Sequence, residues 1–151
     1  MKIKFRHSSL LLLVVMLIVS SCAAPAVSGG GKLLVSAKHP ETGIQQGQVF
    51  DLELKLTNPD TINAKVQEIR FEANFFEWAS YEGSIPPLTM EQQANGDGVI
   101  KLDLTIAPTG VEDFVFRFRA NKSGDVQGDW RVVTSTVVTA IETKMKIAGT
   151  T

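Results

Sequence analysis

The segment GQVFDLELKLTNPDTINAKVQEIRF, Gly47–Phe71, decides the fold of this chain. From Val49 to Thr57 apolar and polar residues alternate without a break, which predicts a β-strand with one buried and one solvent-exposed face. Asn58-Pro59-Asp60 predicts a turn, because Asn can hydrogen-bond to the nearby backbone and Pro fixes φ. A second strand is expected over 62–73.

The second strand changes phase partway along its length. Ala64 and Val66 share one parity, whereas Ile69 and Phe71 share the other. A one-residue phase change inside a strand predicts a β-bulge near Gln67-Glu68.

Further apolar or alternating segments predict the remaining strands. They are Leu33–Lys38, Leu88–Gln92 as a short edge strand, Val99–Ile106, and two strands within Trp130–Ile147 joined by a turn at 140–143. Short strands separated by Gly, Pro and Asn turns predict a mainly β fold. We expect an immunoglobulin- or fibronectin-III-like antiparallel β-sandwich of about seven strands, formed by residues 32–151.

The segment Val111–Asn121 fits two structures. As a strand, it places Phe at every second position; as a helix, it places four apolar residues on one stripe. A helix would also have Thr109 available as N-cap, with Glu112 and Asp113 in its first turn. Periodicity alone leaves both a strand and one short helix open.

The N-terminus has the features of a signal peptide over residues 1–21. Met1–Ser9 is basic, and Leu10–Val19 is an apolar run of ten residues. Such a run is too short to span a bilayer, which takes about 20 residues, and suits the hydrophobic region of a signal peptide.

The next residues, Val19-Ser20-Ser21-Cys22, resemble the bacterial lipobox. The resemblance implies that Cys22 becomes the first mature residue and carries lipid such as palmitate. The alternative is an ordinary signal peptide with a chance cysteine. Cys22 is the chain's only cysteine, so no intrachain disulfide can form. Because Ala23 follows it rather than Asp, the resemblance implies outer-membrane sorting in a Gram-negative host.

Residues 22–31 are expected to combine the lipidated cysteine with a flexible tether. Ala23–Gly31 has no charge, one Pro and three consecutive Gly residues. Nine such residues have an r.m.s. reach of about 15–18 Å. The domain is therefore expected to lie close to the membrane surface.

Charge and residue types narrow the classes of function. After the leader, 12 basic and 16 acidic residues give a net charge of −4, which does not favour nucleic acid. His39 is the only histidine after the leader, so a catalytic triad would have to use it. The turn Asn95–Gly98 matches part of an EF-hand loop but lacks the acids at its first and last positions. We therefore predict no catalytic, cofactor or metal site.

Two clusters have both a binding and a structural interpretation. Phe75-Phe76-Glu77-Trp78 and Tyr81 are either a platform for sugar or lipid, or rings that pack the core and its rim. The basic residues are either an anion patch or partners of nearby acids; they are Arg117, Arg119, Lys122 and Arg131. Asp125 and Asp129 are expected in a solvated loop over 122–129.

The motif from Gly47 to Pro59, Gly-Gln-x-Phe-x-Leu-x-Leu-x-Leu-x-Asn-Pro, resembles the late-embryogenesis-abundant type 2 family, the water-stress and hypersensitive-response domain. Ala94-Asn95-Gly96 and Trp130-Arg131-Val132 are similar to two further family segments. The chain departs from the family at Asp60 and at Asn63-Ala64-Lys65. The resemblance implies a sandwich fold, a helix over 111–121 and association with dehydration stress, and it implies no catalytic residue.

These observations together favour a non-enzymatic, lipid-anchored protein of the cell envelope that protects against desiccation or other stress. Its expected partner is the membrane, through the lipid on Cys22. The alternative is an envelope binding or assembly module that uses an exposed sheet edge at Leu33–Lys38 or Leu88–Gln92 to bind a protein.

Overall fold

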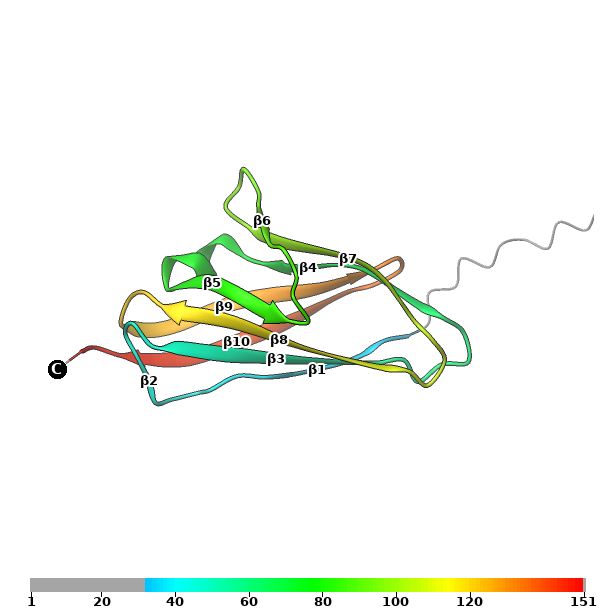
Figure 1. Ribbon diagram of the computed structural model, residues 1–151, viewed down its shortest axis with the longest axis horizontal. Coiled ribbons are helices and arrows are strands. Elements are labelled where there is room, and N and C mark those ends of the chain that lie inside the picture. Colours follow the sequence, from blue (N-terminus) through cyan, green and yellow to red (C-terminus); the bar gives the residue numbers. More distant parts are fainter. Residues whose placement is uncertain (1–31, 151) are drawn as a thin grey trace, which may run out of the picture.

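The chain folds into a sandwich of two β-sheets packed face to face (Figure 1). The computed structural model describes residues 32–150. The first sheet has the strand order β1–β3–β8–β5, formed by Leu34–Lys38, Val49–Thr57, Val111–Ala120 and Ala79–Ile85. The second has the order β2–β10–β9–β4–β7–β6, formed by Ile44–Gln45, Val138–Ala148, Gly124–Thr134, Ala64–Phe71, Gly98–Ile106 and Glu91–Gln92. All pairings are antiparallel except that of β2 with β10.

The core between the sheets is rich in aromatic rings. Phe71 on β4 stacks on Trp130 of β9 with ring centroids 5.2 Å apart and contacts Phe116 and Phe118 of β8 edge-on. The buried Trp130 Nε1–H donates to Thr143 Oγ1 at 3.0 Å, so its polar atom is satisfied. Rings from both sheets therefore interlock at the centre of the fold.

The sequence predictions for the sandwich, for β3 and for the bulge are confirmed. β3 spans Val49–Thr57, the range expected from its alternation. The register of β4 against both β7 and β9 shifts between Val66 and Glu68. Residues 32–150 form ten strands, of which β2 and β6 have two residues each; the remaining eight compare with the seven expected.

Of the two structures left open for Val111–Asn121, the strand is confirmed and the helix implied by the family resemblance is wrong, because this segment is the strand β8. β8 lies between β3 and β5, and it is hydrogen-bonded on both sides. Phe114, Phe116 and Phe118 all point into the core. Pairing on two sides and burial of three alternating rings outweigh the local helix signals. Within residues 32–150 the helical segment is the short 3₁₀ helix η1, Ala73–Glu77, and no helix there is long and apolar enough to cross a membrane.

The turn expected at 140–143 is also wrong, because β10 runs unbroken from Val138 to Ala148. The chain reverses at 135–137 instead. There the Thr134 hydroxyl donates to the Val137 carbonyl at 2.9 Å and accepts the Val137 N–H at 2.9 Å. The loop expected over 122–129 is also wrong, because Asp125 and Asp129 lie in β9. β9 and β10 are therefore two long strands that form one hairpin.

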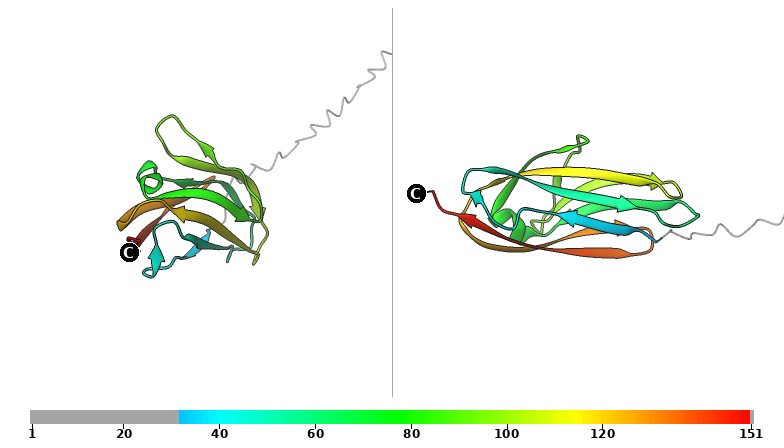
Figure 2. Two further views of the ribbon diagram at one scale, coloured as in Figure 1. Left: turned by 60° about the vertical axis from the view of Figure 1, so that its left-hand side comes forward. Right: turned by 90° about the horizontal axis from the view of Figure 1, so that it is seen from below.

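The sandwich has two ends of different character. The described chain begins, in blue, at one end of the sandwich in Figures 1 and 2, and we call this end the entry end. The C-terminus lies at the opposite end, the far end. The entry-end segments are 57–63, which includes the last residue of β3, and the loops 107–110 and 135–137. The far-end connections are 39–43, 72–78, 93–97 and 121–123.

Candidate functional site

The predicted anchor lies outside the described residues. This applies to Cys22, to the signal peptide over 1–21 and to the tether over 22–31. The structure does place the first described residue, Lys32, whose backbone N–H donates to the Asp60 carboxylate at 2.5 Å. Because Asp60 lies in an entry-end loop, a tether from Cys22 would join the domain at that end.

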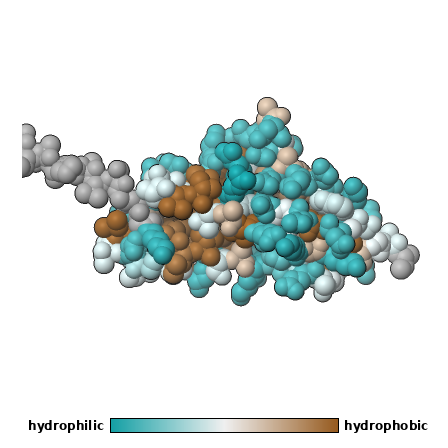
Figure 3. All heavy atoms as spheres, turned by 180° about the vertical axis from the view of Figure 1, so that it is seen from behind, coloured by the Kyte–Doolittle hydropathy of each residue, from teal (hydrophilic) through white to brown (hydrophobic). Residues whose placement is uncertain are grey.

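Exposed aliphatic side chains gather at the entry end. Five residues there are 45–57% exposed: Leu34, Ile62, Val111, Val137 and Val138. The remaining exposed large hydrophobic residue, Ile85, is 59% exposed. It ends the edge strand β5 and pairs with Val115, about halfway along β8 and away from the entry end. Figure 3 shows hydrophobic surface concentrated in the half of the domain at the entry end. A group of exposed apolar side chains at one end of a domain is typical of an interaction site.

The five residues come from both sheets. Leu34 and Val111 flank Thr57 in the last rung of the four-stranded sheet. Val138 pairs across the hairpin with Val133, the last outward residue of β9, and Val137 completes the turn. The aliphatic residues therefore surround the end of the sandwich, and we call them the aliphatic ring.

Asn58 holds the entry-end loops together. Its side chain is fully buried and donates to the carbonyls of Ile62, Ile106 and Ala107 at 2.8, 2.9 and 3.0 Å. Its Oδ1 accepts the Asp60 N–H at 3.1 Å, as expected from the sequence, and its own N–H donates to Gly110. The tertiary bonds were not predicted. They fix two loops to each other, so the aliphatic ring stands on a rigid frame.

Thr109 adds backbone strain to this end. It has φ +59° at the third position of a turn that Gly110 closes by donating to Ala107, with Pro108 at the second position. The third position of a type II turn requires a positive φ, so Gly is preferred there and a β-branched residue is unfavourable.

The far end carries the predicted aromatic cluster. Phe75 is 1% exposed and contacts Phe71 and Phe118, with ring centroids 5.9 and 4.9 Å away. Trp78 lies under Lys122, whose Nζ is 4.6 Å from the ring centroid. These contacts match the interpretation in which the rings pack the core and its rim.

A hollow of about 360 Å³ lies beside this cluster between β5 and β6. Phe76, Tyr81 and Met90 supply its larger side chains. The Tyr81 hydroxyl is already used, because it donates to the Leu88 carbonyl at 2.9 Å. Ser80 and Gln92 also line the hollow, and the Ser80 hydroxyl donates to Asn121 Oδ1 at 3.2 Å. The hollow is wide and open, and its one titratable lining group is the Tyr81 hydroxyl, so it does not present an acid and a base to a substrate.

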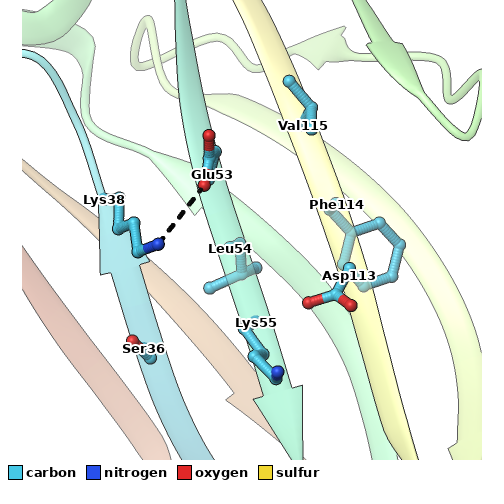
Figure 4. A pocket seen from close by; sticks show the side chains of 8 residues that line it. All are labelled: Ser36, Lys38, Glu53, Leu54, Lys55, Asp113, Phe114 and Val115. Atoms are coloured by element: carbon cyan, nitrogen blue, oxygen red, sulfur yellow. Dashed lines mark ion pairs between the residues drawn. The ribbon is translucent and has the colours of Figure 1, made fainter.

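A shallow groove crosses the outer face of the four-stranded sheet (Figure 4). It runs over β1, β3 and β8, and Lys38 Nζ lies 4.0 Å from Glu53 Oε2 within it. Lys55 and Asp113 form the next cross-strand pair. Charges of alternating sign on an exposed sheet face do not select a ligand of one charge.

The basic residues of the possible anion patch each have a nearby partner. The partners are Asp51 for Arg117, Glu82 for Arg119, Glu72 for Arg131 and the Trp78 ring for Lys122. The hydrogen bond from Arg119 lowers the pKa of Glu82 below its ordinary value, and the bond to Asp51 raises the pKa of Arg117. The patch is therefore divided into separate surface pairs.

Neither His39 nor the turn at 95–98 assembles a reactive site. His39 Nδ1 lies 3.5 Å from the Pro40 carbonyl. Asp97 accepts the Ala73 N–H at 3.0 Å and the Asn95 side-chain N–H at 2.9 Å, so its oxygens serve the fold. Across residues 32–150 no group of three His, Cys, Asp or Glu side chains is arranged to hold a metal ion.

The sheet edges differ in how well they are protected. β1 has a hydrogen-bonded neighbour, β3, on one side, and its five residues LVSAK include one charge, Lys38. β5, at the other edge of that sheet, has a register shift between Tyr81 and Gly83 and is followed by two prolines. Bulges and prolines protect an edge from pairing. β1 is therefore the more open edge of the four-stranded sheet. The other predicted edge, Leu88–Gln92, shortens to the two-residue β6.

Comparison with known proteins gives the fold. No family model and no curated protein matches this chain. A cohesin module from a Clostridium perfringens family 33 glycoside hydrolase is 15% identical, covers 78% of this chain and 98% of its own, and has a TM-score of 0.52. A Nocardia farcinica protein with an immunoglobulin-like fold is 15% identical over 76% of this chain and 97% of its own, with a TM-score of 0.48. The chain is thus a β-sandwich similar in fold to a cohesin module.

Proposed function

We propose that this protein is a non-enzymatic, lipid-anchored domain of the cell envelope. One observation carries the proposal: the only cysteine, Cys22, follows a ten-residue apolar run and two small residues, and it lies ten residues before Lys32. Two or more acyl chains on that residue would hold the domain stably on a membrane. The position of Lys32 at one end of the sandwich supports the proposal, because a tether attached there leaves both sheets free.

Intact-mass spectrometry of the membrane-extracted protein tests the anchor. We expect the wild type to have the mass of residues 22–151 plus two or three acyl chains. A Cys22→Ala variant should lack that mass and leave the membrane fraction. An unmodified wild-type mass in the soluble fraction would contradict the anchor.

The protective role rests on the resemblance of Gly47–Pro59 to the water-stress family. A strain lacking the protein is expected to survive desiccation and osmotic shock less well than its parent. Restoring the wild-type protein should recover survival, whereas Cys22→Ala should not if the membrane position is needed. Equal survival of deletion and parent strains would remove the stress role and leave the anchor untouched.

A second candidate function is binding of a protein strand along β1. The observation that favours it is the open edge at Leu34–Lys38, which carries one charge. Strand addition uses such an edge through main-chain hydrogen bonds. A photo-crosslinking residue at Ser36 should capture a defined partner in intact envelopes. The matched control is Gln127, exposed on the central strand β9. No adduct, or equal adducts at both positions, would count against this function.

A further inference from the structure

We propose that the entry end of the sandwich rests on the lipid bilayer, with the aliphatic ring in contact with acyl chains at the membrane interface. This inference rests on the proposed function, since it takes Cys22 as the anchor. It goes further by assigning a second membrane contact to the folded domain and by fixing the domain's orientation. The occupant of the apolar surface is thus a lipid surface.

The first support is the distribution of the exposed aliphatic side chains. Five of the six exposed large hydrophobic residues among residues 32–150 belong to the aliphatic ring. They come from β1, β8 and β10 and from two loops, so no single strand's pattern places them together. Scattered surface hydrophobic residues need no explanation, whereas a group of them at one end does.

The second support is the near absence of charge on the entry-end loops. Residues 57–63, 107–110 and 135–137 contain one ionisable side chain, that of Asp60, which accepts the Lys32 N–H. The four far-end connections contain six: His39, Glu41, Glu72, Glu77, Asp97 and Lys122. Moving an unpaired charge out of water is unfavourable. Lys32, at the start of the described chain, adds one exposed charge to the entry end. With two ionisable side chains against six, the entry end opposes approach to a bilayer less than the far end does.

The third support is the length of chain between Cys22 and the domain. The nine residues Ala23–Gly31, expected from their composition to be a flexible tether, would have an r.m.s. reach of about 15–18 Å. The longest strands have eleven residues, which extend about 36 Å. A tether joined to the entry end keeps that end near the lipid while the far end points away. At such short range the effective concentration is in the millimolar range, so a weak contact is populated.

Net charge indicates which force makes the contact. Residues 32–150 have 12 basic and 16 acidic side chains, so an anionic membrane does not attract the domain. Contact through aliphatic side chains is insensitive to salt screening. We therefore expect the orientation to be the same on zwitterionic and on anionic vesicles.

Depth-dependent fluorescence quenching tests the orientation on the mature, acylated protein. With Cys22 acylated, an introduced cysteine is the single reactive thiol. We would label Val137→Cys at the entry end and Ala94→Cys at the far end, and anchor both in phosphatidylcholine vesicles that carry brominated lipid. The label at 137 is expected to be quenched at least fivefold more than the label at 94. Equal quenching at the two positions would overturn the proposal.

Substitution of the ring separates contact from simple proximity. In the Val137→Cys protein we would change the other four ring residues to Thr: Leu34, Ile62, Val111 and Val138. Thr is chosen because it keeps a high β-strand propensity. Burying one methylene group in the membrane contributes about 0.8 kcal/mol, which raises the binding constant about fourfold. Quenching at 137 should fall to the level seen at 94. The control Ile85→Thr removes the most exposed aliphatic residue outside the ring and should change nothing.

Other outcomes exclude the proposal in distinct ways. Unchanged quenching in the four-residue variant would overturn it, as would quenching that requires anionic lipid. A label at 137 that is shielded from lipid and cross-links to a second copy would show that the ring is covered by self-association.

If wild-type protein carries no acyl chain, the anchor fails separately. Flotation of that unacylated mature protein with vesicles, lost in a variant with all five ring residues changed to Thr, would then still support the contact; equal flotation of the two would overturn it.

Discussion

At the far end of the sandwich the fold buries its own large side chains, whereas at the entry end it leaves them in solvent. Phe75 is 1% exposed and packs among other rings, while Val137, on a hairpin of the same domain, is 56% exposed. Both ends are well ordered by hydrogen bonds, through Asp97 at one and Asn58 at the other. The exposure of aliphatic side chains at the entry end is therefore not explained by disordered loops.

The comparison separates residues that stabilise the domain from residues available for contact with something outside it. Far-end apolar residues should contribute strongly to the free energy of unfolding. Entry-end apolar residues should contribute little to the free energy of unfolding. The hydrogen bonds of Asn58, which hold the entry-end loops together, should contribute substantially. Substitutions at the two ends can test this division.

The largest effect is expected for Phe75→Ala. Removing a buried ring leaves a cavity, and such changes cost about 3–5 kcal/mol in unfolding free energy. Urea denaturation followed by tryptophan fluorescence measures it. The adjacent Phe76→Ala, which removes a half-buried ring, should cost clearly less. Equal costs for the two variants would show that η1 does not close the core as described.

Asn58→Ala should have the next largest effect. It removes three side-chain donations and leaves the buried Ile106 carbonyl without this partner, which we expect to cost about 2–3 kcal/mol. Asn63→Ala is the matched control, because Asn63 is exposed; thermal unfolding compares the pair. A cost for Asn58→Ala no greater than that of the control would mean that the entry-end frame is not held by this side chain.

Gly124→Ala tests the packing of Trp78. Gly124 has φ +148°, and a Cβ there would lie 2.5 Å from Trp78 Cζ3. We expect a loss of about 1–3 kcal/mol, because the ring must shift. At Gly43, with φ +87°, a Cβ meets nothing within 4 Å, so Gly43→Ala reports the backbone term alone. Equal losses, measured by thermal unfolding, would indicate that the ring moves away freely.

The smallest effect is expected for Val137→Thr and Val138→Thr. Both side chains are exposed, and Thr keeps the branched shape, so stability should change by no more than about 0.5 kcal/mol. Chemical denaturation of the double variant checks this. A loss as large as that of Asn58→Ala would mean that these residues support the fold and are not free for lipid.

Local pattern was sufficient for much of the fold. The alternation in Val49–Thr57 predicted β3 because one face of the strand is buried and the other is exposed along its whole length. The phase change beside Gln67 predicted the bulge because side-chain parity cannot change in a regular strand. For Val111–Ala120 the same alternation left a strand and a helix both open, and pairing with two distant strands decided the structure.

The aliphatic ring was not predicted, because its members are far apart in sequence and each looks ordinary in its own segment. A usable signal was present in the loops: TNPDTIN, APTG and STV together contain one charge. Recognising it required knowledge that these loops share an end of the sandwich. The tertiary bonds of Asn58 were hidden for the same reason, since sequence gives only its bond to the nearby backbone.

Amide hydrogen exchange, followed by mass spectrometry, tests the orientation of the whole domain most directly. It compares the protein anchored on vesicles with the same protein after its tether has been cut. Our account predicts that anchoring slows exchange in residues 57–63, 107–111 and 134–138, with no change in 93–97 and 121–124. Protection at the far end, or along an outer sheet face in place of the entry end, would contradict the account.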